Sequence, residues 1–276
     1  MISRNIPSVS ILTRSLYNAV MESITIHPIN ALSDNYIWAL VRDDYCVIVD
    51  PGEAEPALRF IAERGLSLKA ILVTHHHWDH TNGIAEVLNH SDVPVYAGAN
   101  DPVAACTHPL KEGDVVSIPE LSLSLQVLDI PGHTLGHIAL YNDEIAFTGD
   151  TLFTAGCGKI FEGTAEQMYA SLQKLKTLPE ATKVYCGHEY TEANLDFALK
   201  VEPDNPAVLA RAGEVAGLRM QGKPTVPASM ALERATNPFL RTQEPSVIRA
   251  AEQWAGHPLM SPVEVLAALR TWKNQG

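Results

Sequence analysis

The sequence predicts an α/β protein with an all-helical domain at its C-terminus. Up to Gly187, short apolar runs rich in β-branched residues alternate with amphipathic segments, which is the order of elements in a layered α/β fold. After Gly187, the segments are rich in Ala and Leu at helical spacing, and none has a convincing strand pattern. We therefore expect strands and helices in the first part of the chain and helices alone in the last.

The individual elements follow from hydrophobic periodicity and from the Gly and Pro residues between them. The segment Glu53–Arg64 is an amphipathic helix that ends at Gly65, a residue type that commonly terminates helices. The other expected helices are Thr81–Asn89, Tyr190–Lys200, Asn205–Gln221, Ala228–Ala235, Pro245–Ala255 and Pro262–Lys273. The expected strands are Ile24–Pro28, Tyr36–Val41, Cys46–Val49, Ala70–Val73, Val93–Ala97, Val115–Ile118, Leu121–Asp129, Ala139–Phe147 and Lys183–Cys186.

The composition is that of a globular protein and argues against several classes of function. Of the 276 residues, 46% are hydrophobic and 19% are charged, and no apolar run is long enough to span a bilayer. The formal net charge of -12 argues against general binding to nucleic acid or acidic membranes, since both need a basic surface. Cys46, Cys106, Cys157 and Cys186 are far apart and form no CxxC motif, so we expect buried free thiols in a reducing compartment, although spacing alone leaves a disulfide open.

Residues 1–20 have a composition of their own. They contain Arg4, Arg14 and several Ser and Thr but no acidic residue, whereas the chain from Glu22 onward is rich in acids. Two interpretations are open: a transit peptide, or an extension from an early start codon with Met21 as the working start. The small number of arginines and the weak amphipathic character favour the second interpretation, and neither makes the segment part of the fold.

The stretch Ala70–Asn82, AILVTHHHWDHTN, gives the strongest functional signal. An apolar strand, which we expect to be buried on both faces, leads directly into four histidines and one aspartate. In an extended segment His75 and His77 project to the same side, and the turn that follows can aim Asp79 and His80 at a second point. Imidazoles and a carboxylate at this density are typical metal ligands, and the arrangement suits two ions better than one.

Three further strand ends repeat one pattern, a Gly beside a His or an Asp. The motifs PGHTLGH, TGDT and GHEY each follow an apolar run and place His133, Asp150 and His188 at its end. Glycine lets the backbone turn sharply and lets a side chain approach a common centre closely. The repetition favours one shared metal site over three unrelated polar residues.

The motifs HHHWDH, PGHTLGH, FTGDTLF and GHEYT resemble the metal-binding motifs of the metallo-β-lactamase superfamily. Within it, AGCGKIFEGT and the C-terminal RTWK resemble the glyoxalase II, or hydroxyacylglutathione hydrolase, family. The resemblance extends from about Met21 to the C-terminus. It implies an αββα sandwich with the metals at one edge, in which residues 21–188 are the catalytic domain and residues 189–276 a helical glutathione-binding domain.

The resemblance also implies the ligands of two divalent ions. These are His75, His77 and His133 for the first ion, Asp79, His80 and His188 for the second, and Asp150 as the bridge between them. A water shared by two cations ionises near neutral pH, so the site would hold a bridging hydroxide, with Asp79 as the catalytic residue that keeps it in line. Zinc, iron and manganese all suit such sites, and zinc is our first expectation.

The remaining polar residues near the motifs are expected to act indirectly or not at all. His76 and His137 would orient ligands or pair with backbone carbonyls, and Asp50 would hydrogen-bond to a ligand imidazole. The histidines in no matching context are His27, His90, His108 and His257.

An anionic glutathione moiety needs local positive charge on a protein whose total charge is negative. On composition alone, Arg270 and Lys273 would be a solvated helix face. The resemblance reverses this, because the glyoxalase II pattern has basic residues where Lys159, Arg270 and Lys273 stand, and each would pair with a substrate carboxylate.

Three more positions concern the substrate. Tyr190 and Asn194 match contact positions of the family. Phe161 is a departure, because many members have Tyr there, and a hydroxyl contact to the substrate backbone is lost.

Together these features imply the hydrolysis of S-D-lactoylglutathione, or of another S-2-hydroxyacylglutathione, to glutathione and the 2-hydroxy acid, a step in methylglyoxal degradation. A glutathione persulfide dioxygenase with a single iron is the alternative, and retention of Asp79, His80 and His188 argues against it. A β-lactamase has no role for the cationic helical domain, and a non-enzymatic descendant would have lost ligands. We expect a cytoplasmic monomer, organellar if residues 1–20 are a transit peptide.

Overall fold

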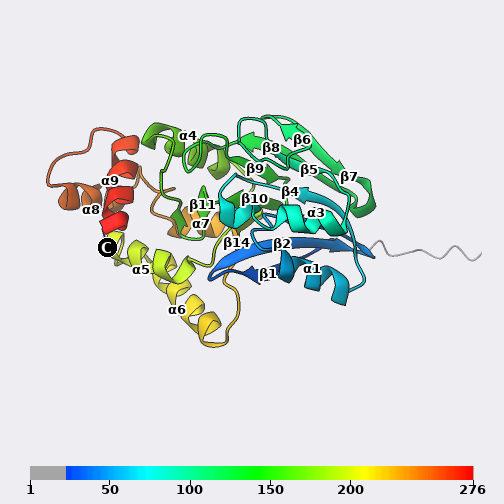
Figure 1. The fold of residues 1–276 in the computed structure, drawn as a ribbon. Helices are drawn as coiled ribbons and strands as arrows, with labels where there is room; N and C mark the ends of the chain where they lie inside the picture. Colours follow the sequence, from blue (N-terminus) through cyan, green and yellow to red (C-terminus); the bar gives the residue numbers. More distant parts are fainter. Residues whose placement is uncertain (1–22, 276) are drawn as a thin grey trace, which may run out of the picture.

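The computed structural model describes residues 23–275, so the expectations for residues 1–20 lie outside it. Two six-stranded sheets stack face to face, with helices outside both, and the C-terminal helices lie at one end (Figure 1). This is the αββα arrangement that the resemblance implies.

The first sheet has the strand order β1-β2-β3-β4-β5-β6. Its first three strands pair antiparallel, and β3, β4, β5 and β6 pair parallel, with helices in the connections before β4 and β5. The bounds are β1 (Thr25–Ala31), β2 (Asn35–Arg42), β3 (Tyr45–Val49), β4 (Ser67–Leu72), β5 (Val95–Gly98) and β6 (His108–Leu110).

The second sheet has the strand order β14-β13-β10-β9-β8-β7. All neighbours pair antiparallel except β10 and β13, which are parallel. The bounds are β7 (Val115–Ile118), β8 (Leu123–Asp129), β9 (Ile138–Tyr141), β10 (Ile145–Gly149), β13 (Lys183–Cys186) and β14 (Ala228–Ser229). A separate small hairpin is formed by β11 (Leu152–Phe153) and β12 (Gly156–Cys157).

The helices form the outer layers and the C-terminal part of the molecule. On the first sheet lie α1 (Ala54–Glu63) and α3 (Ile84–His90), with the single turn α2 (Trp78–Thr81) before α3. On the second sheet lies α4 (Ala165–Lys176). The remaining helices are α5 (Thr191–Val201), α6 (Pro206–Met220), α7 (Met230–Thr236), α8 (Pro245–Ala255) and α9 (Pro262–Gln275), and a 3-10 turn covers Pro119–Leu121.

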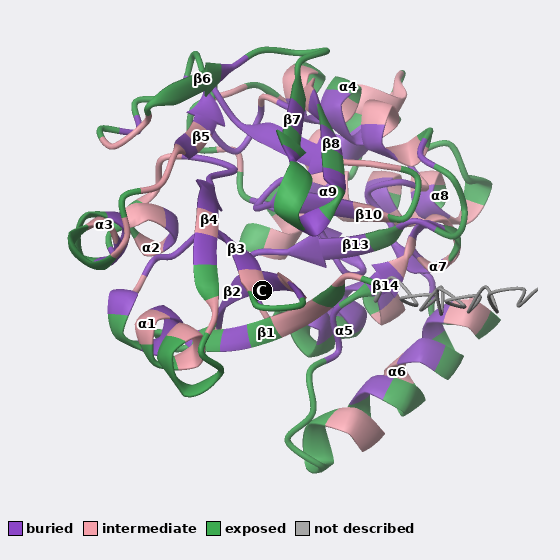
Figure 2. Ribbon diagram, turned by 90° about the vertical axis from the view of Figure 1, so that its right-hand side faces the viewer, coloured by how far each residue is buried: buried purple, intermediate pink, exposed green. Residues whose placement is uncertain are grey.

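Strand β4 is buried on both faces, as the apolar run predicts. Ala70 and Leu72 belong to the cluster between the two sheets, whereas Ile71 and Val73 pack toward α1 and α3. Figure 2 shows the same burial along the inner strands, in contrast to α6, much of which is exposed. Because both faces are packed, the strand end that carries the His-rich turn is held rigidly.

Several details of the expected elements were wrong. The region after Gly187 is not helical throughout, because Ala228 and Ser229 pair with β13 as strand β14, and Ser229 then caps the helix that begins at Met230. The short strands β6, β11 and β12 were also not expected. Ala139–Phe147 is two strands, β9 and β10, because Asn142 accepts the backbone N–H groups of Glu144 and Ile145 and so closes a turn between them. The segment Thr81–Asn89 is divided at Asn82–Gly83 into α2 and α3. Helix α4 was not expected, although Thr164 and Gln167 form its capping box.

The cysteines are free as expected, but one of them is not buried. All four cysteines are free, and Cys46, Cys157 and Cys186 are buried, whereas Cys106 is partly exposed. Within residues 23–275, none of the helices combines the length and the apolar character that a membrane crossing needs.

Gly52 marks a close approach of two backbones beside the His-rich turn. A Cβ atom at Gly52 would lie 1.7 Å from the carbonyl oxygen of Asp79. Gly213, in contrast, is exposed in the interior of α6, and a Cβ atom there would meet nothing within 4 Å.

We predict opposite effects of alanine at these two glycines. Gly52→Ala forces the backbones apart and should lower the free energy of unfolding by about 1–3 kcal/mol. Gly213→Ala should raise it by roughly 0.5–1 kcal/mol, because alanine restricts the unfolded chain and favours helix. Denaturant titration of both variants measures the difference, and a Gly52→Ala chain as stable as the parent would contradict the close approach.

Candidate metal centre

Four strand ends from both sheets meet at one edge of the sandwich. The His-rich turn follows β4 of the first sheet, and His133, Asp150 and His188 follow β8, β10 and β13 of the second. The carboxylate of Asp150 lies at the centre: its oxygens are 3.4 Å from His80 Nε2, 3.5 Å from His133 Nε2 and 3.3 Å from His188 Nε2. Residues far apart in the sequence therefore share one centre.

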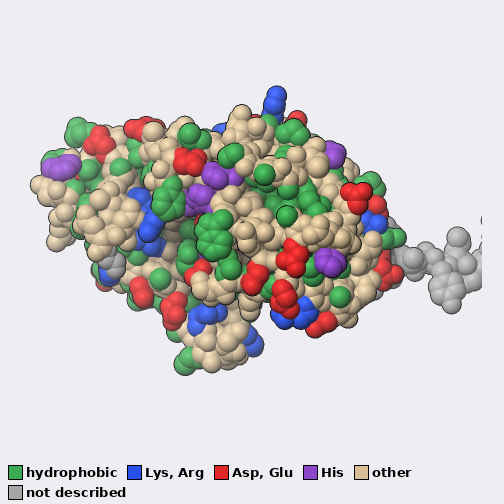
Figure 3. Space-filling model, viewed as in Figure 1, with side chains coloured by type: hydrophobic (Ala, Val, Ile, Leu, Met, Phe, Trp, Pro, Cys, Tyr) green, Lys and Arg blue, Asp and Glu red, His purple; other side chains and the backbone are tan. Residues whose placement is uncertain are grey.

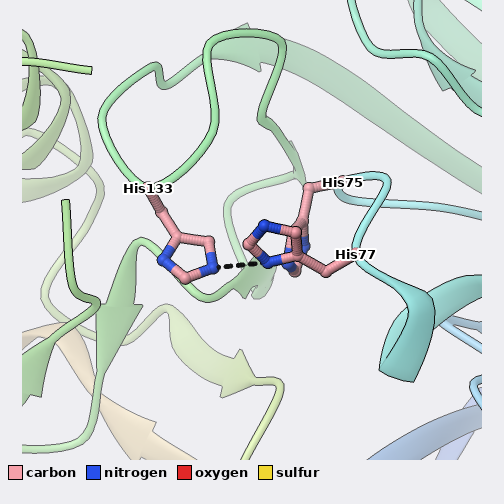
Figure 4. A group of neighbouring side chains, drawn as sticks. All are labelled: His75, His77 and His133. Carbon is pink, nitrogen blue, oxygen red and sulfur yellow. Dashed lines mark hydrogen bonds between the residues drawn. The ribbon is translucent and has the colours of Figure 1, made fainter. Parts of the chain in front are cut away.

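The first cluster consists of His75, His77 and His133, whose ligand atoms lie within 4.8 Å of one another. Figure 4 shows the three imidazoles pointing toward one another from two loops, with His133 Nε2 3.0 Å from His77 Nδ1. His75 is fully buried, and its Nε2 has no hydrogen-bond partner among the described residues. Three nitrogen atoms thus converge on one point.

The second cluster consists of Asp79, His80 and His188, again with ligand atoms within 4.8 Å of one another. Asp79 Oδ2 lies 3.5 Å from His80 Nε2 and 3.4 Å from His188 Nε2. Asp150 lies within 3.5 Å of members of both clusters.

The hydrogen bonds of the imidazoles fix which nitrogen faces the centre. His75 Nδ1 bonds to Thr74, His80 Nδ1 to Asp50, His133 Nδ1 to the carbonyl of Lys159, and His188 Nδ1 to Asp34. Each of these bonds leaves Nε2 for the centre. Three buried atoms at the centre have no hydrogen-bond partner within residues 23–275, namely His75 Nε2, His80 Nε2 and Asp150 Oδ1. Unpaired buried polar atoms are costly, and this set of nitrogen and carboxylate donors fits a pair of divalent cations.

A cavity of about 790 Å³ opens beside the two clusters. Its walls include His77, Asp79, His133, Asp150 and His188 as well as all six residues expected on the substrate side, namely Lys159, Phe161, Tyr190, Asn194, Arg270 and Lys273. Figure 3 shows Lys and Arg side chains near α9, beside a hollow that has histidine and apolar side chains around it. The cationic end and the metal clusters thus belong to one cavity.

The cavity residues differ in how firmly they are held. Arg270 is 6% exposed, and its Nη1 donates to the carbonyl of Cys157 at 2.6 Å. Lys273 is partly buried and contacts Asn194 Oδ1, whereas Lys159 is exposed. The Tyr190 ring stacks on His188 at 4.7 Å between centroids.

Both parts of the chain match known families. The metallo-beta-lactamase superfamily model matches residues 32–188, and the model of the hydroxyacylglutathione hydrolase C-terminus matches residues 189–276. A hydroxyacylglutathione hydrolase of Alkalilimnicola ehrlichii is 55% identical over 249 residues, which are 90% of this chain and 97% of that protein. One from Nitrosomonas eutropha is 51% identical over 251 residues, covering 91% and 98%. This chain belongs to the hydroxyacylglutathione hydrolase family.

A solved structure supports the fold of this family member independently. The crystal structure of ETHE1 from Myxococcus xanthus has a TM-score of 0.64 at 24% sequence identity, over 91% of both chains. The metallo-β-lactamase fold and the family resemblance expected from the motifs are both confirmed.

Two residues of this hydroxyacylglutathione hydrolase family member were missed in the sequence. Asp34 accepts the Nδ1–H of His188 at 2.7 Å, and the side-chain amide of Asn35 donates to Asp79 Oδ2 at 3.0 Å. Asp34 lies in the turn between β1 and β2, and Asn35 is the first residue of β2, so both are far in sequence from the residues that they hold. No local pattern distinguishes them from an ordinary Asp-Asn turn.

Asp50 and His137 make contacts of the kind expected of them, whereas His76, among the described residues, pairs with carboxylates and not with a ligand or a backbone carbonyl. Asp50 accepts from Thr74 and lies 3.1 Å from His80 Nδ1. His76 points to two carboxylates, Asp101 at 2.9 Å and Glu162 at 3.3 Å. His137 is buried, and its Nε2 accepts the backbone N–H of Asp150 at 3.1 Å, which orients the central carboxylate.

The charges at the centre are strongly coupled. Burial alone would raise the pKa of Asp150, but the imidazoles of His80 and His188 hold it well below its usual range. Burial alone would lower the pKa of His188, yet Asp150 and Asp79 raise it to about 10. Burial and the charge on His80 keep the pKa of His75 well below its ordinary value. A cation that binds the second cluster must displace protons, so its affinity rises with pH.

We predict that Asp34→Ala weakens binding of one of two divalent ions by roughly 10–100-fold, because His188 loses the carboxylate that orients it. The first cluster makes no contact with Asp34 and should keep its ion. Competition with a chromophoric chelator measures both affinities, and Asp44→Ala, an exposed acid in the next turn, is the control. Equal loss of both ions, or of neither, would argue against this role of Asp34.

Proposed function

We propose that this chain hydrolyses S-2-hydroxyacylglutathione thioesters, with S-D-lactoylglutathione as the reference substrate, to glutathione and the 2-hydroxy acid. One observation carries the proposal: a cavity lined by three basic side chains has members of both metal-ligand clusters in its wall. The relatives in this family are named hydroxyacylglutathione hydrolases, which agrees with this assignment. The reaction belongs to methylglyoxal degradation.

In this proposal the two parts of the chain have different roles, catalysis and glutathione binding. We place the catalytic domain at residues 21–188 and the glutathione-binding helical domain at residues 189–276, a division supported by the two family models, which meet at residue 188. The helical part is not independent of the rest, because α5, α8 and α9 share an apolar cluster with α4 and the second sheet.

The resident ions in this proposal are two divalent cations, zinc first and iron or manganese as other possibilities. The first cluster would hold one ion and the second cluster the other, with Asp150 in contact with both. When bound, such ions supply an ionised water near neutral pH and polarise the thioester carbonyl.

The side chains bind the substrate and orient the attack. Hydrogen bonds from His188 and Asn35 outweigh the effect of burial and lower the pKa of Asp79, so that its ionised carboxylate can accept a hydrogen bond from the attacking water. Lys159, Arg270 and Lys273 would pair with the carboxylates of the glutathione moiety. Tyr190 and Asn194 complete that wall.

The alternative, a single-iron glutathione persulfide dioxygenase, needs fewer ligands than this chain has. The described residues include both complete clusters, which supports the thioesterase over the dioxygenase. Four free thiols agree with a cytoplasmic location, which we propose together with a monomeric state and no partner other than the small-molecule substrate.

We predict metal-dependent loss of the thioester ultraviolet band when the loaded chain meets S-D-lactoylglutathione. A chelator should abolish the activity, and two equivalents of divalent ion per chain should restore it. His188→Ala should lower kcat/KM by more than about 100-fold because a ligand of the second ion is lost. His90→Ala, an exposed histidine outside both clusters, should leave it unchanged. A loaded parent chain that leaves the band intact would refute the function.

We predict that the KM of the parent rises as the pH increases through about 7. Burial and the positive charge of Arg270 lower the pKa of Lys273 to about 7, so the ammonium that binds a carboxylate is present below this pH and lost above it. Loss of one charged contact corresponds to a KM increase of about ten-fold or more. Lys273→Arg keeps its charge, so its KM should stay flat between pH 6 and pH 9. The same rise in both proteins would exclude Lys273 as the cause.

We predict that Phe161→Tyr lowers KM by about two- to ten-fold with kcat unchanged. Phe161 is 64% exposed in the cavity wall, and its ring meets those of His77 and His133 edge-on, so a hydroxyl group can be added without a clash with the core. The added hydroxyl restores the contact that family members with Tyr have. Phe60→Tyr, outside the cavity, is the control in the same assay. An unchanged KM in Phe161→Tyr would show that Phe in place of Tyr at position 161 does not affect substrate binding.

A further inference from the structure

The turn of the small β11–β12 hairpin adopts a conformation that its own sequence does not favour. Leu152 pairs with Cys157 and Phe153 with Gly156, which leaves a two-residue turn, Thr154 and Ala155. Ala155 has a φ of 55°, in the left-handed region that costs an L-amino acid energy and usually carries Gly or Asn. Contacts from elsewhere must therefore stabilise this turn.

Two side chains make such contacts, Glu233 within α7 and Asn237 directly after it. Glu233 Oε2 accepts the backbone N–H of Ala155 at 2.9 Å. The amide of Asn237 donates to the carbonyls of Phe153 at 3.2 Å and Gly156 at 2.9 Å, and also to Glu233 Oε2 at 3.0 Å. Both side chains are fully buried. Helix α7 thus binds the hairpin on both sides of its turn.

Helices α5 and α9 bind the same hairpin. Asn194 of α5 donates to the carbonyl of Thr154 at 2.8 Å, and Arg270 of α9 donates to the carbonyl of Cys157 at 2.6 Å. Four carbonyls and one N–H of the hairpin thus bond to side chains from the region that follows His188. Asn194 and Arg270 also line the cavity.

The hairpin forms part of the cavity wall and contacts both the second metal cluster and the cationic side chains, because Phe153 meets the ring of His188 and the carbonyl of Cys157 accepts from Arg270. In sequence it lies between Asp150 and Lys159, and Phe153 and Cys157 line the cavity. A displacement of the hairpin would move two features of the cavity together: Lys159, which follows the hairpin in sequence, and the carbonyl of Cys157, which accepts from Arg270. Asp150 has separate support, because His137 accepts its backbone N–H.

Packing alone does not explain why a carboxyl group is buried at position 233. Glu233 Oε1 has no hydrogen-bond partner among the described residues, and burial raises the pKa of the carboxyl group to about 7. A buried, partly satisfied carboxyl group is less favourable than an apolar side chain of the same size. An apolar side chain at position 233 could not accept the backbone N–H of Ala155, which Glu233 does accept.

We propose that Glu233 and Asn237 are positioning residues that hold the β11–β12 hairpin against α5 and α9 and so shape the wall that binds the glutathione moiety. The inference rests on the proposed function for the identity of the ligand. It assigns to α7 a role in substrate binding although neither side chain lines the cavity.

The test compares two substitutions of equal length in the metal-loaded full chain. Glu233→Met removes the acceptor and should raise KM for S-D-lactoylglutathione about ten-fold, with kcat within about two-fold and two ions retained. Glu233→Gln keeps an acceptor and should leave KM within about two-fold of the parent. Thr236→Val, a buried change in the same helix that loses only a bond to Leu232 of that helix, should lower the Tm without raising KM.

Hydrogen exchange of the Ala155 amide provides a readout that does not depend on activity. Exchange should be at least about ten-fold faster in Glu233→Met than in the parent, and near the parent rate in Glu233→Gln and Thr236→Val. An unchanged exchange rate or an unchanged KM in Glu233→Met would overturn the inference, as would an equal rise of KM in Thr236→Val. If the loaded parent does not hydrolyse the thioester, the proposed function fails, and the exchange rate decides whether Glu233 holds the hairpin.

Discussion

The structure depends on the carboxylate of Asp150, which lies among imidazoles from three other chain segments. It is within 3.5 Å of His80, His133 and His188, and it is 6% exposed. A carboxylate in this position is stabilised only if positive charge surrounds it, so the histidines and any bound cations must be present together. Two sheets are needed to build such a centre, because each supplies strand ends that the other cannot reach.

The helical part of the chain is connected to this centre through backbone contacts as well as through apolar packing. Its helices share a core with the second sheet, and its side chains bind the carbonyls of the β11–β12 hairpin. The same Arg270 lines the cavity and donates to the carbonyl of Cys157, so one guanidinium group links the cavity wall to the position of the hairpin. This linkage couples the position of Arg270 in the cavity wall to that of the β11–β12 hairpin.

Much of the fold and the candidate ligands followed from local sequence, because buried strands and His- and Asp-bearing strand ends leave short-range patterns. The division of these ligands into two clusters followed from the family resemblance. Asp34 and Asn35 left no short-range pattern, since their importance comes from the distant residues that they contact, His188 and Asp79. Glu233 likewise sits in an ordinary helical pattern, and only the fold reveals its bond to Ala155. Helix α4 is different, because its capping box of Thr164 and Gln167 is a short-range sequence pattern from which the helix could have been predicted.

Anomalous diffraction at the zinc absorption edge, from crystals of the zinc-loaded chain, tests the two-ion centre most directly. The account predicts two peaks, one within the first cluster and one within the second, with Asp150 in contact with both. A single peak, or peaks that lie away from Asp150, would contradict it.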